Sequence, residues 1–212
     1  MTTLPPLLGI SPGDQGCGRT LTWLIQGAVD GGLQALVLRE PHLSRAAYVE
    51  LARRVSPLLR QGLILHDSHV DARGIASASG WGLHLIRASD VRAVRPHVRG
   101  WLGVTCYGRE ELEQATADGA DYALIGPVFG DEASEGEGRP TLGLEGLRGV
   151  LGEGVLPAFA VGGICGETAP LLLDTDVAGL AASTFLFPDD ADADTCALNA
   201  ATLCAIMARR SH

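Results

Sequence analysis

Short apolar segments alternate with amphipathic segments along nearly the whole chain. The apolar segments are about four to six residues long and largely apolar rather than alternating with polar residues, which is typical of parallel strands covered on both faces. We therefore expect eight strands, at Leu7–Ser11, Leu33–Leu38, Leu63–His66, Gly82–Leu85, Trp101–Thr105, Tyr122–Ile125, Ala158–Val161 and Val177–Ala181.

The segments between these strands carry the three- and four-residue spacing of amphipathic helices. Ser44 can cap a helix that buries the apolar positions following it. These positions are Ala47, Leu51, Ala52 and Val55. Another helix is predicted from about Arg109, with Gly119 placed to end it.

The C-terminal segment has the charge pattern of a helix. Asp192 and Asp194 lie at its start, and Arg209 and Arg210 lie at its end. Because acidic residues favour a helix N-terminus and basic residues a C-terminus, we predict a closing helix between these pairs.

Eight strand–helix units of roughly 25 residues each fill the chain, which indicates a parallel sheet built from βα crossovers. The alternatives are a (β/α)8 barrel and an open doubly wound sheet. The first strand lacks a following GxGxxG motif, and the eighth is as apolar as the middle ones. We therefore predict an α/β protein in which residues 1–212 form a single (β/α)8 TIM-barrel domain.

Composition narrows the partners and the chemistry. Apolar residues make up 46% of the 212 residues and charged residues 19%, which suits a protein with a sizeable core. The formal net charge of −9 argues against nucleic acid or an anionic membrane as the main partner. All 16 residues counted as lysine plus arginine are arginine. This excludes a lysine Schiff base, lysine-anchored pyridoxal phosphate and a Walker-type P-loop.

Cysteine usage and the N-terminus indicate a cytoplasmic protein. No CxxC pair occurs, so neither a disulfide framework nor a zinc site is signalled. The N-terminus has no basic region, and no apolar run reaches the roughly 18–20 residues of a membrane span. The five cysteines are Cys17, Cys106, Cys165, Cys196 and Cys204.

In a barrel of this kind, functional groups gather where the strands end. Gly162 and Gly163 end the seventh strand, and Ala182 and Ser183 end the eighth. Glycines let an anion approach the backbone, so we expect a phosphate-binding site formed by these two loops. The alternative for the glycine pair is a tight turn with no ligand.

Substrate contacts are expected from three more strand ends, at Arg39, Thr105 and Gly126. The planar guanidinium of Arg39 suits a phosphate or a carboxylate. An ion pair with the adjacent Glu40 at the barrel rim is equally compatible with the sequence.

Candidate acid/base residues are His66, His84 and Tyr107, which lie at the ends of the third, fourth and fifth strands. A hydrogen-bonded core residue is the favoured interpretation of His84, which lies between two leucines. Cys106 has no evident cationic neighbour to activate its thiol.

Asp67, which follows the third strand, is the candidate metal ligand. Its carboxylate could bind Mg²⁺. It could instead cap the following helix, which is the commoner role for an aspartate there. The expected cofactor is therefore none or Mg²⁺.

A series of segments resembles the thiamine phosphate synthase family, including its thiazole tautomerase (TenI-type) branch. The similarity runs from about Leu33 to Phe187. The family fold is a (β/α)8 barrel, in agreement with the strand pattern. The segments are Leu38-Arg39-Glu40, Gly82-Leu83-His84-Leu85, Gly103-Val104-Thr105, Gly119-Ala120-Asp121-Tyr122, Gly126-Pro127-Val128-Phe129, Gly143-Leu144-Glu145-Gly146-Leu147 and Val161-Gly162-Gly163-Ile164.

The resemblance implies one of two reactions. The synthase joins a hydroxymethylpyrimidine diphosphate to a thiazole phosphate with magnesium and releases pyrophosphate, and the tautomerase aromatises the thiazole phosphate by moving a proton. Both hold the thiazole phosphate on the loops after strands seven and eight. The resemblance transfers this role to Gly162, Gly163 and Ser183, and the family arginine to Arg39.

The sequence departs from the synthase pattern around the diphosphate. Val37 and Pro41 stand where the pattern has glutamine and lysine, and His66 stands in place of asparagine. The second magnesium carboxylate falls on Ser89, with Asp90 one position away.

The loop Gly130–Pro140 departs as well. Four carboxylates near a diphosphate would repel it, since one like-charge pair at about 4 Å costs about 4 kcal/mol at an effective dielectric constant near 20. These are Asp131, Glu132, Glu135 and Glu137, with Arg139 as the only cation of the loop.

These departures favour a thiazole tautomerase, although Tyr107 stands where that branch has a histidine. The alternatives are a divergent synthase that uses Arg39 and Arg139, and a non-catalytic barrel that binds a phosphate ligand. In each case the partner is a small phosphorylated thiazole. The sequence leaves a homo-oligomer open.

Overall fold

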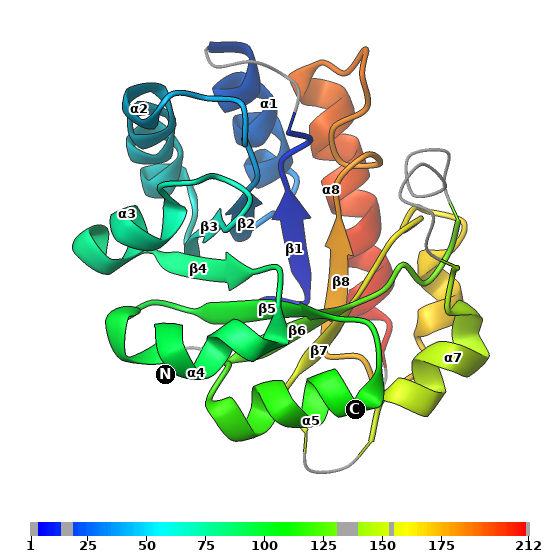
Figure 1. Ribbon diagram of the computed structural model, residues 1–212. Helices are drawn as coiled ribbons and strands as arrows, with labels where there is room; N and C mark the ends of the chain where they lie inside the picture. Colours follow the sequence, from blue (N-terminus) through cyan, green and yellow to red (C-terminus); the bar gives the residue numbers. More distant parts are fainter. Residues whose placement is uncertain (1–3, 14–18, 131–139, 153–154, 211–212) are drawn as a thin grey trace.

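Eight parallel strands close into a barrel in chain order, from β1 to β8 (Figure 1). The computed structural model describes residues 4–13, 19–130, 140–152 and 155–210. The strands are β1 (Leu7–Ile10), β2 (Ala35–Leu38), β3 (Gly62–His66), β4 (Gly82–Leu85), β5 (Leu102–Cys106), β6 (Tyr122–Ile125), β7 (Ala158–Val161) and β8 (Gly179–Ala182).

Closure of the sheet confirms the barrel and excludes the open doubly wound alternative. The first strand pairs with the last, with Leu7 opposite Leu180, and with the second, with Leu8 opposite Ala35. Strands β4, β6 and β7 have the predicted bounds. The prediction began β2 and β8 too early, at Leu33 and Val177, because these residues are apolar and buried but lie in the connections.

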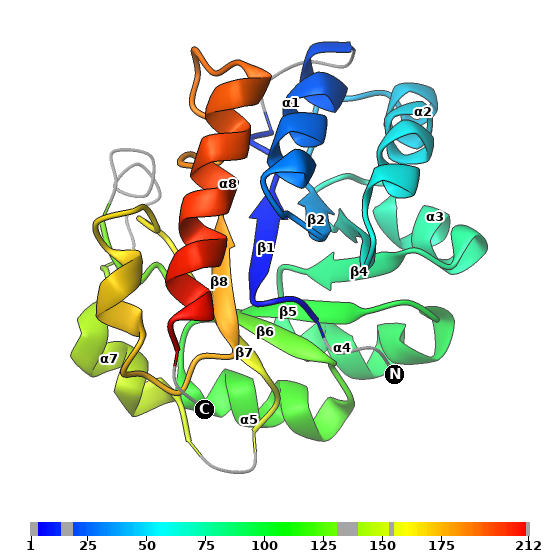
Figure 2. The ribbon, with the colours of Figure 1, turned by 180° about the vertical axis from the view of Figure 1, so that it is seen from behind.

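Helices cover the outside of the barrel (Figure 2). The helices of the described residues are α1 (Arg19–Asp30), α2 (Arg45–Val55), α3 (Ala72–Ser79), α4 (Val91–Val94), α5 (Arg109–Asp118), α7 (Gly143–Val150) and α8 (Ala193–Ala208). Short 3₁₀ turns add η1 (Ser56–Leu58), η2 (Ala88–Asp90), η3 (Arg95–His97) and η4 (Ala169–Leu172).

The predicted helix ends are confirmed by their capping contacts. Ser44 Oγ accepts from Ala47 N at 3.3 Å at the start of α2. Asp192 Oδ1 accepts from Thr195 N at 2.8 Å at the start of α8. Gly119 adopts the left-handed conformation that ends α5. Side-chain oxygens satisfy N–H groups that the helix itself leaves unpaired.

Helices α1 and α8 lie side by side in both views (Figures 1 and 2). A methyl group on Gly27 would overlap the carbonyl of Ala193, and one on Gly31 would overlap the carbonyl of Ala197. Small residues on both helices therefore allow the first and last helices to approach closely, where the barrel closes.

Aromatic rings fill the barrel interior. The rings of His84 and Tyr122 lie 5.6 Å apart, and those of Tyr122 and Phe159 lie 5.8 Å apart. Neighbouring strands supply glycines that make room for them. A side chain on Gly103 would overlap the Tyr122 ring, and one on Gly179 would lie 2.5 Å from the Phe159 ring.

Candidate functional site

The carboxyl ends of the strands bring several predicted residues together at one end of the barrel. His66 of β3 lies opposite His84 of β4 in the parallel register, and their rings are 5.4 Å apart. Thr105 of β5 reaches His84, and the charge of Arg39, which follows β2, acts on His66. These four side chains form the polar layer at this end of the barrel.

His84 is fully buried and hydrogen-bonded at both ring nitrogens. Nδ1 lies 3.0 Å from the Tyr122 hydroxyl, and Nε2 lies 3.0 Å from the Thr105 hydroxyl. Burial holds the pKa of His84 well below its usual range and raises the pKa of Tyr122, so both groups are neutral near pH 7. His84 is thus a hydrogen-bonded core histidine, and an acid/base role for it stays a prediction.

His66 has a defined tautomer. The Ser68 backbone N–H donates to His66 Nδ1 at 3.1 Å, so Nδ1 is an acceptor and Nε2 carries the proton. Burial and the nearby Arg39 charge lower the pKa of His66 to about 4, which keeps the imidazole neutral. The backbone N–H of His66 donates to the Tyr48 hydroxyl at 3.3 Å, which fixes the end of β3.

The loop after β7 turns on two glycines in the left-handed region. Gly162 and Gly163 have φ values of 92° and 61°, which favour glycine. Thr168 Oγ1 donates to Gly163 O at 2.7 Å and accepts from Cys165 N at 2.9 Å, which holds the loop in place. No described residue accepts a hydrogen bond from the N–H of Gly163 or Ile164.

The glycine pair also has a packing requirement that does not involve a ligand. A side chain on Gly162 would lie 2.6 Å from Pro127 Cβ, and one on Gly163 would lie 2.8 Å from Phe129 Cβ. The loop after β6 therefore packs directly against the loop after β7. Both the turn and the phosphate interpretations of Gly162-Gly163 are compatible with this arrangement.

The loop after β8 is a tight turn in which Phe187 N donates to Ser183 O at 2.9 Å. Ala182 is buried within the strand, so it can offer only its backbone to a ligand. Ser183 is partly exposed. Because β7 and β8 are adjacent and in register, Gly163 and Ser183 follow neighbouring strand ends.

Arg39 is oriented by the backbone of the loop after β1. Its Nη2 donates to Pro12 O at 2.8 Å, whereas Glu40 accepts from Gly13 N at 3.2 Å. Among the described residues Arg39 and Glu40 form no ion pair with each other, since Arg39 contacts the Pro12 carbonyl and Glu40 the Gly13 N–H. The buried Nε of Arg39 has no acceptor in the part of the chain that the structure describes.

Asp67 binds an arginine that the sequence analysis did not single out. Its two oxygens accept from Nε and Nη2 of Arg73, each at 2.7 Å, and the same Nη2 lies 2.5 Å from Asp90 Oδ2. The helix-capping role considered for Asp67 is wrong, since the N-cap residue of α3 is Asp71.

This arrangement does not fit a magnesium ion. A guanidinium already occupies the oxygens that would bind it, and within the described ranges no group of three or more His, Cys, Asp or Glu side chains is placed to hold a metal. Mg²⁺ requires near-octahedral oxygen ligands at about 2.0–2.1 Å.

Tyr107 follows β5 and contacts the helix after it. It lines a groove with residues of η2 and α5, and its backbone N–H donates to Glu111 Oε2 at 2.7 Å. Cys106 is buried, and burial raises the pKa of its thiol to about 12, which keeps it protonated and unreactive. Gly126 precedes a cis peptide bond to Pro127 and is buried against the Val161 carbonyl.

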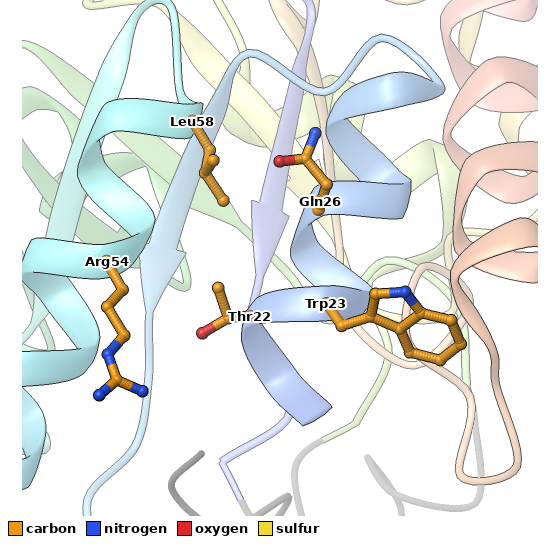
Figure 3. A pocket seen from close by; sticks show the side chains of 5 residues that line it. All are labelled: Thr22, Trp23, Gln26, Arg54 and Leu58. Atoms are coloured by element: carbon orange, nitrogen blue, oxygen red, sulfur yellow. The ribbon is translucent and has the colours of Figure 1, made fainter. Parts of the chain in front are cut away.

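Another pocket lies on the outside of the barrel between α1 and α2 (Figure 3). Trp23 and Gln26 come from α1 and Arg54 from α2. Arg54 is paired with Glu50 at 2.9 Å, and Trp23 is 54% exposed. The pocket is separate from the strand ends, and two of its polar side chains, Gln26 and Arg54, already pair with residues of their own helices, so it is a weaker candidate than the barrel mouth.

Sequence reasoning missed three supporting residues: Arg73, Thr168 and Tyr48. The contacts of Arg73 and Tyr48 join a helix to strand ends, and those of Thr168 hold a loop, so sequence spacing carried no signal for them. The order in which acidic residues follow β3 and β4 could have suggested a cation between Asp67 and Asp90.

Comparison with known proteins identifies the family of this chain. The family described as "Thiamine monophosphate synthase" matches residues 7–186. The chain belongs to this family.

Relatives within the family cover most of the chain. The thiamine-phosphate synthase of Moorella thermoacetica is 34% identical over 73% of this chain and 74% of its own. That of Bordetella avium is 32% identical over 90% of this chain and 93% of its own. The Pyrococcus furiosus thiamine phosphate pyrophosphorylase structure superposes with a TM-score of 0.78 at 23% identity, over 97% of this chain and 96% of that chain.

The acidic residues predicted to repel a diphosphate, within Asp131 to Arg139, lie outside the described residues, as does Cys17.

Across the described ranges, no helix is long and apolar enough to span a membrane.

Proposed function

We propose that this protein is a thiamine-phosphate synthase, which joins a hydroxymethylpyrimidine diphosphate to a thiazole phosphate and releases pyrophosphate. The proposal takes the alternative over the tautomerase that the sequence analysis favoured, because relatives that match most of the chain carry the synthase name. The observation that carries it is that the segments Gly162–Ile164 and Ala182–Thr184 follow two paired strands at one barrel end, in a chain of this family.

The thiazole phosphate would bind between the loops after β7 and β8. The N–H groups of Gly163 and Ile164, which have no acceptor among the described residues, and the Ser183 hydroxyl offer donors to its oxygens. Arg39 would attract the diphosphate, since its guanidinium retains a buried Nε without an acceptor among the described residues. Thr105, supported by neutral His84, would orient the ring of a substrate at the centre of the mouth.

A second candidate is the thiazole tautomerase. It is favoured by the neutral His66, which presents a proton at Nε2 beside Arg39, and by the arginine that fills the Asp67–Asp90 pair. A proton transfer needs an acid/base group within reach of the substrate and does not need a diphosphate site.

Three measurements on the purified protein distinguish the functions. Thiamine phosphate and pyrophosphate formation from both substrates, followed by chromatography, supports the synthase. Growth of aromatic thiazole absorbance from the dihydro tautomer, without product in the first assay, supports the tautomerase. Thermal stabilisation by a thiazole phosphate without turnover in either assay would replace both with a non-catalytic binding function. The variant Arg39→Gln, tested in the same synthase assay, should have lower turnover than the wild-type protein if the proposal is correct.

A further inference from the structure

Arg73 sits between two carboxylates that follow neighbouring strands. Asp67 follows β3 and Asp90 ends the turn η2 after β4. The guanidinium binds both oxygens of Asp67 at 2.7 Å and one oxygen of Asp90 at 2.5 Å. One nitrogen, Nη2, is shared by the two carboxylates, so an oxygen of each lies within reach of a single cation.

The arrangement is a charge-assisted network rather than an isolated surface pair. The Asp67 side chain is 10% exposed and the Asp90 side chain 28%, so two negative charges are partly withdrawn from water close together. The two carboxylates raise the pKa of Arg73 above its ordinary value. Bidentate bonding of a carboxylate by the planar guanidinium is the strongest form of such a contact.

An arginine in this place competes with any divalent cation. Mg²⁺ would have to displace three hydrogen bonds made by a cation that is tethered to the same chain, and tethering gives that cation a high effective concentration. Mg²⁺ in proteins is usually held by one or two carboxylates together with water and substrate phosphates, so Asp67 and Asp90 without the arginine would suit it. The guanidinium of Arg73 occupies those carboxylate oxygens instead.

The geometry points to Arg73 as a built-in replacement for a divalent cation between Asp67 and Asp90. The guanidinium compensates the two carboxylates that a metal would otherwise bridge, and its Nη1, which has no acceptor among the described residues, is left to donate to an anionic substrate group. This inference deepens the proposed function. The anionic substrate group is the diphosphate only if that proposed function is correct.

Mn²⁺ binding, measured by electron paramagnetic resonance without substrate, tests the inference. Wild type and the control Arg92→Ala, which removes an exposed arginine paired with Asp118 at 2.7 Å, should bind Mn²⁺ no tighter than about 1 mM. Arg73→Ala and the longer Arg73→Gln should bind at least about tenfold tighter, and the double variant Arg73→Ala/Asp67→Asn should lose that gain.

Either of two results overturns the inference. The first is that the folded Arg73 variants gain no Mn²⁺ affinity. The second is that the wild-type protein binds Mn²⁺ as tightly as the Arg73 variants do and loses this binding in Asp67→Asn. Circular dichroism establishes that each variant is folded, and Arg73→Gln serves if Arg73→Ala is not. Because no substrate is present, the Mn²⁺ result stands or falls separately from the turnover assays.

Discussion

Nε2 of His84 lies 3.0 Å from the hydroxyl of Thr105, at the end of the barrel where His66 stacks on the His84 ring. The contact places a polar group that is fully buried next to one that reaches the barrel mouth. The Tyr122 hydroxyl satisfies the opposite nitrogen of the same ring. The imidazole therefore connects the core to the mouth through two hydrogen bonds.

Breaking this connection should destabilise the protein. His84→Leu leaves the buried Tyr122 hydroxyl without a partner and should cost about 2–3 kcal/mol of unfolding free energy in urea titrations. Tyr122→Phe should cost about 1–2 kcal/mol, because it removes one bond and keeps the ring. The double variant should lose less than the sum of the two. Strict additivity would show that the two side chains do not interact.

Stability should fall on acidification because two histidines are held neutral. Folding lowers the pKa of His66 from 6.5 to about 4, and that of His84 also lies below its usual value. Between these limits the unfolded chain binds more protons, so this contribution is present above about pH 6.5 and is lost as the pH falls toward about 4.

The melting temperature at about pH 7.5 and about pH 5 measures this effect. His66→Asn should reduce this difference in melting temperature because it removes the titrating imidazole. The amide oxygen can still accept from Ser68 N, so the local hydrogen bond is kept. His97→Asn, on the exposed turn η3, is the control and should retain the difference. An unchanged difference in His66→Asn would remove His66 as its source.

A negative charge at the end of β8 should weaken phosphate binding. Ser183→Asp places a carboxylate beside the Gly163 loop and should raise the Kd for a thiazole phosphate at least about tenfold, and Ser183→Ala should raise it less. Ser77→Asp, on the exposed side of α3, carries the same added charge away from the site. Equal affinity in the two aspartate variants would place the phosphate elsewhere.

Gly163→Asp should abolish phosphate binding, but it is a less specific probe. Its side chain would also meet Phe129 and would require a φ of 61°. We expect lower stability together with lost binding, so unfolding must be measured beside affinity. Wild-type affinity in this variant would show that the loop after β7 does not hold the phosphate.

Replacement of Arg39 should weaken capture of the diphosphate substrate. Arg39→Gln should lower kcat/KM at least about tenfold because it removes the cation and an Nε donor that has no acceptor in the described part of the chain. Arg39→Lys should restore only part of it, since an ammonium lacks the planar fork. Arg60→Gln, which removes an exposed arginine outside the site, should leave turnover unchanged. Full activity in Arg39→Gln would exclude Arg39 from substrate binding.

The closing contact between α1 and α8 should tolerate no added methyl group. Gly27→Ala would drive Cβ into the Ala193 carbonyl and should destabilise the protein by about 1–3 kcal/mol. Gly74→Ala in α3, where no atom lies within 4 Å of the added Cβ, should stabilise it by up to about 1 kcal/mol. Chemical denaturation of both variants provides the comparison, and equal effects would contradict close packing at this position.

Local patterns predicted the fold well because the determinants of strands and helices are themselves local. The apolar run at β6 is bordered by Asp121 and Gly126, and the run at β7 by Pro157 and Gly162, so their ends were predicted correctly. Leu33 and Val177 extended two runs into buried connections, where apolarity reports burial rather than strand pairing. The caps at Ser44 and Asp192 depend on residues three positions apart and were likewise visible in the sequence.

The sequence by itself determined the eightfold βα repeat, the set of strand ends that carry polar groups, and the limits that the absence of lysine places on phosphate binding. Only the tertiary structure decided what those polar groups contact. Asp67 binds Arg73 rather than capping α3, Arg39 turns to Pro12 rather than Glu40, and His84 joins Tyr122 to Thr105. Side-chain partners depend on distances between loops that no local pattern encodes, because barrel closure brings residues far apart in the chain into contact.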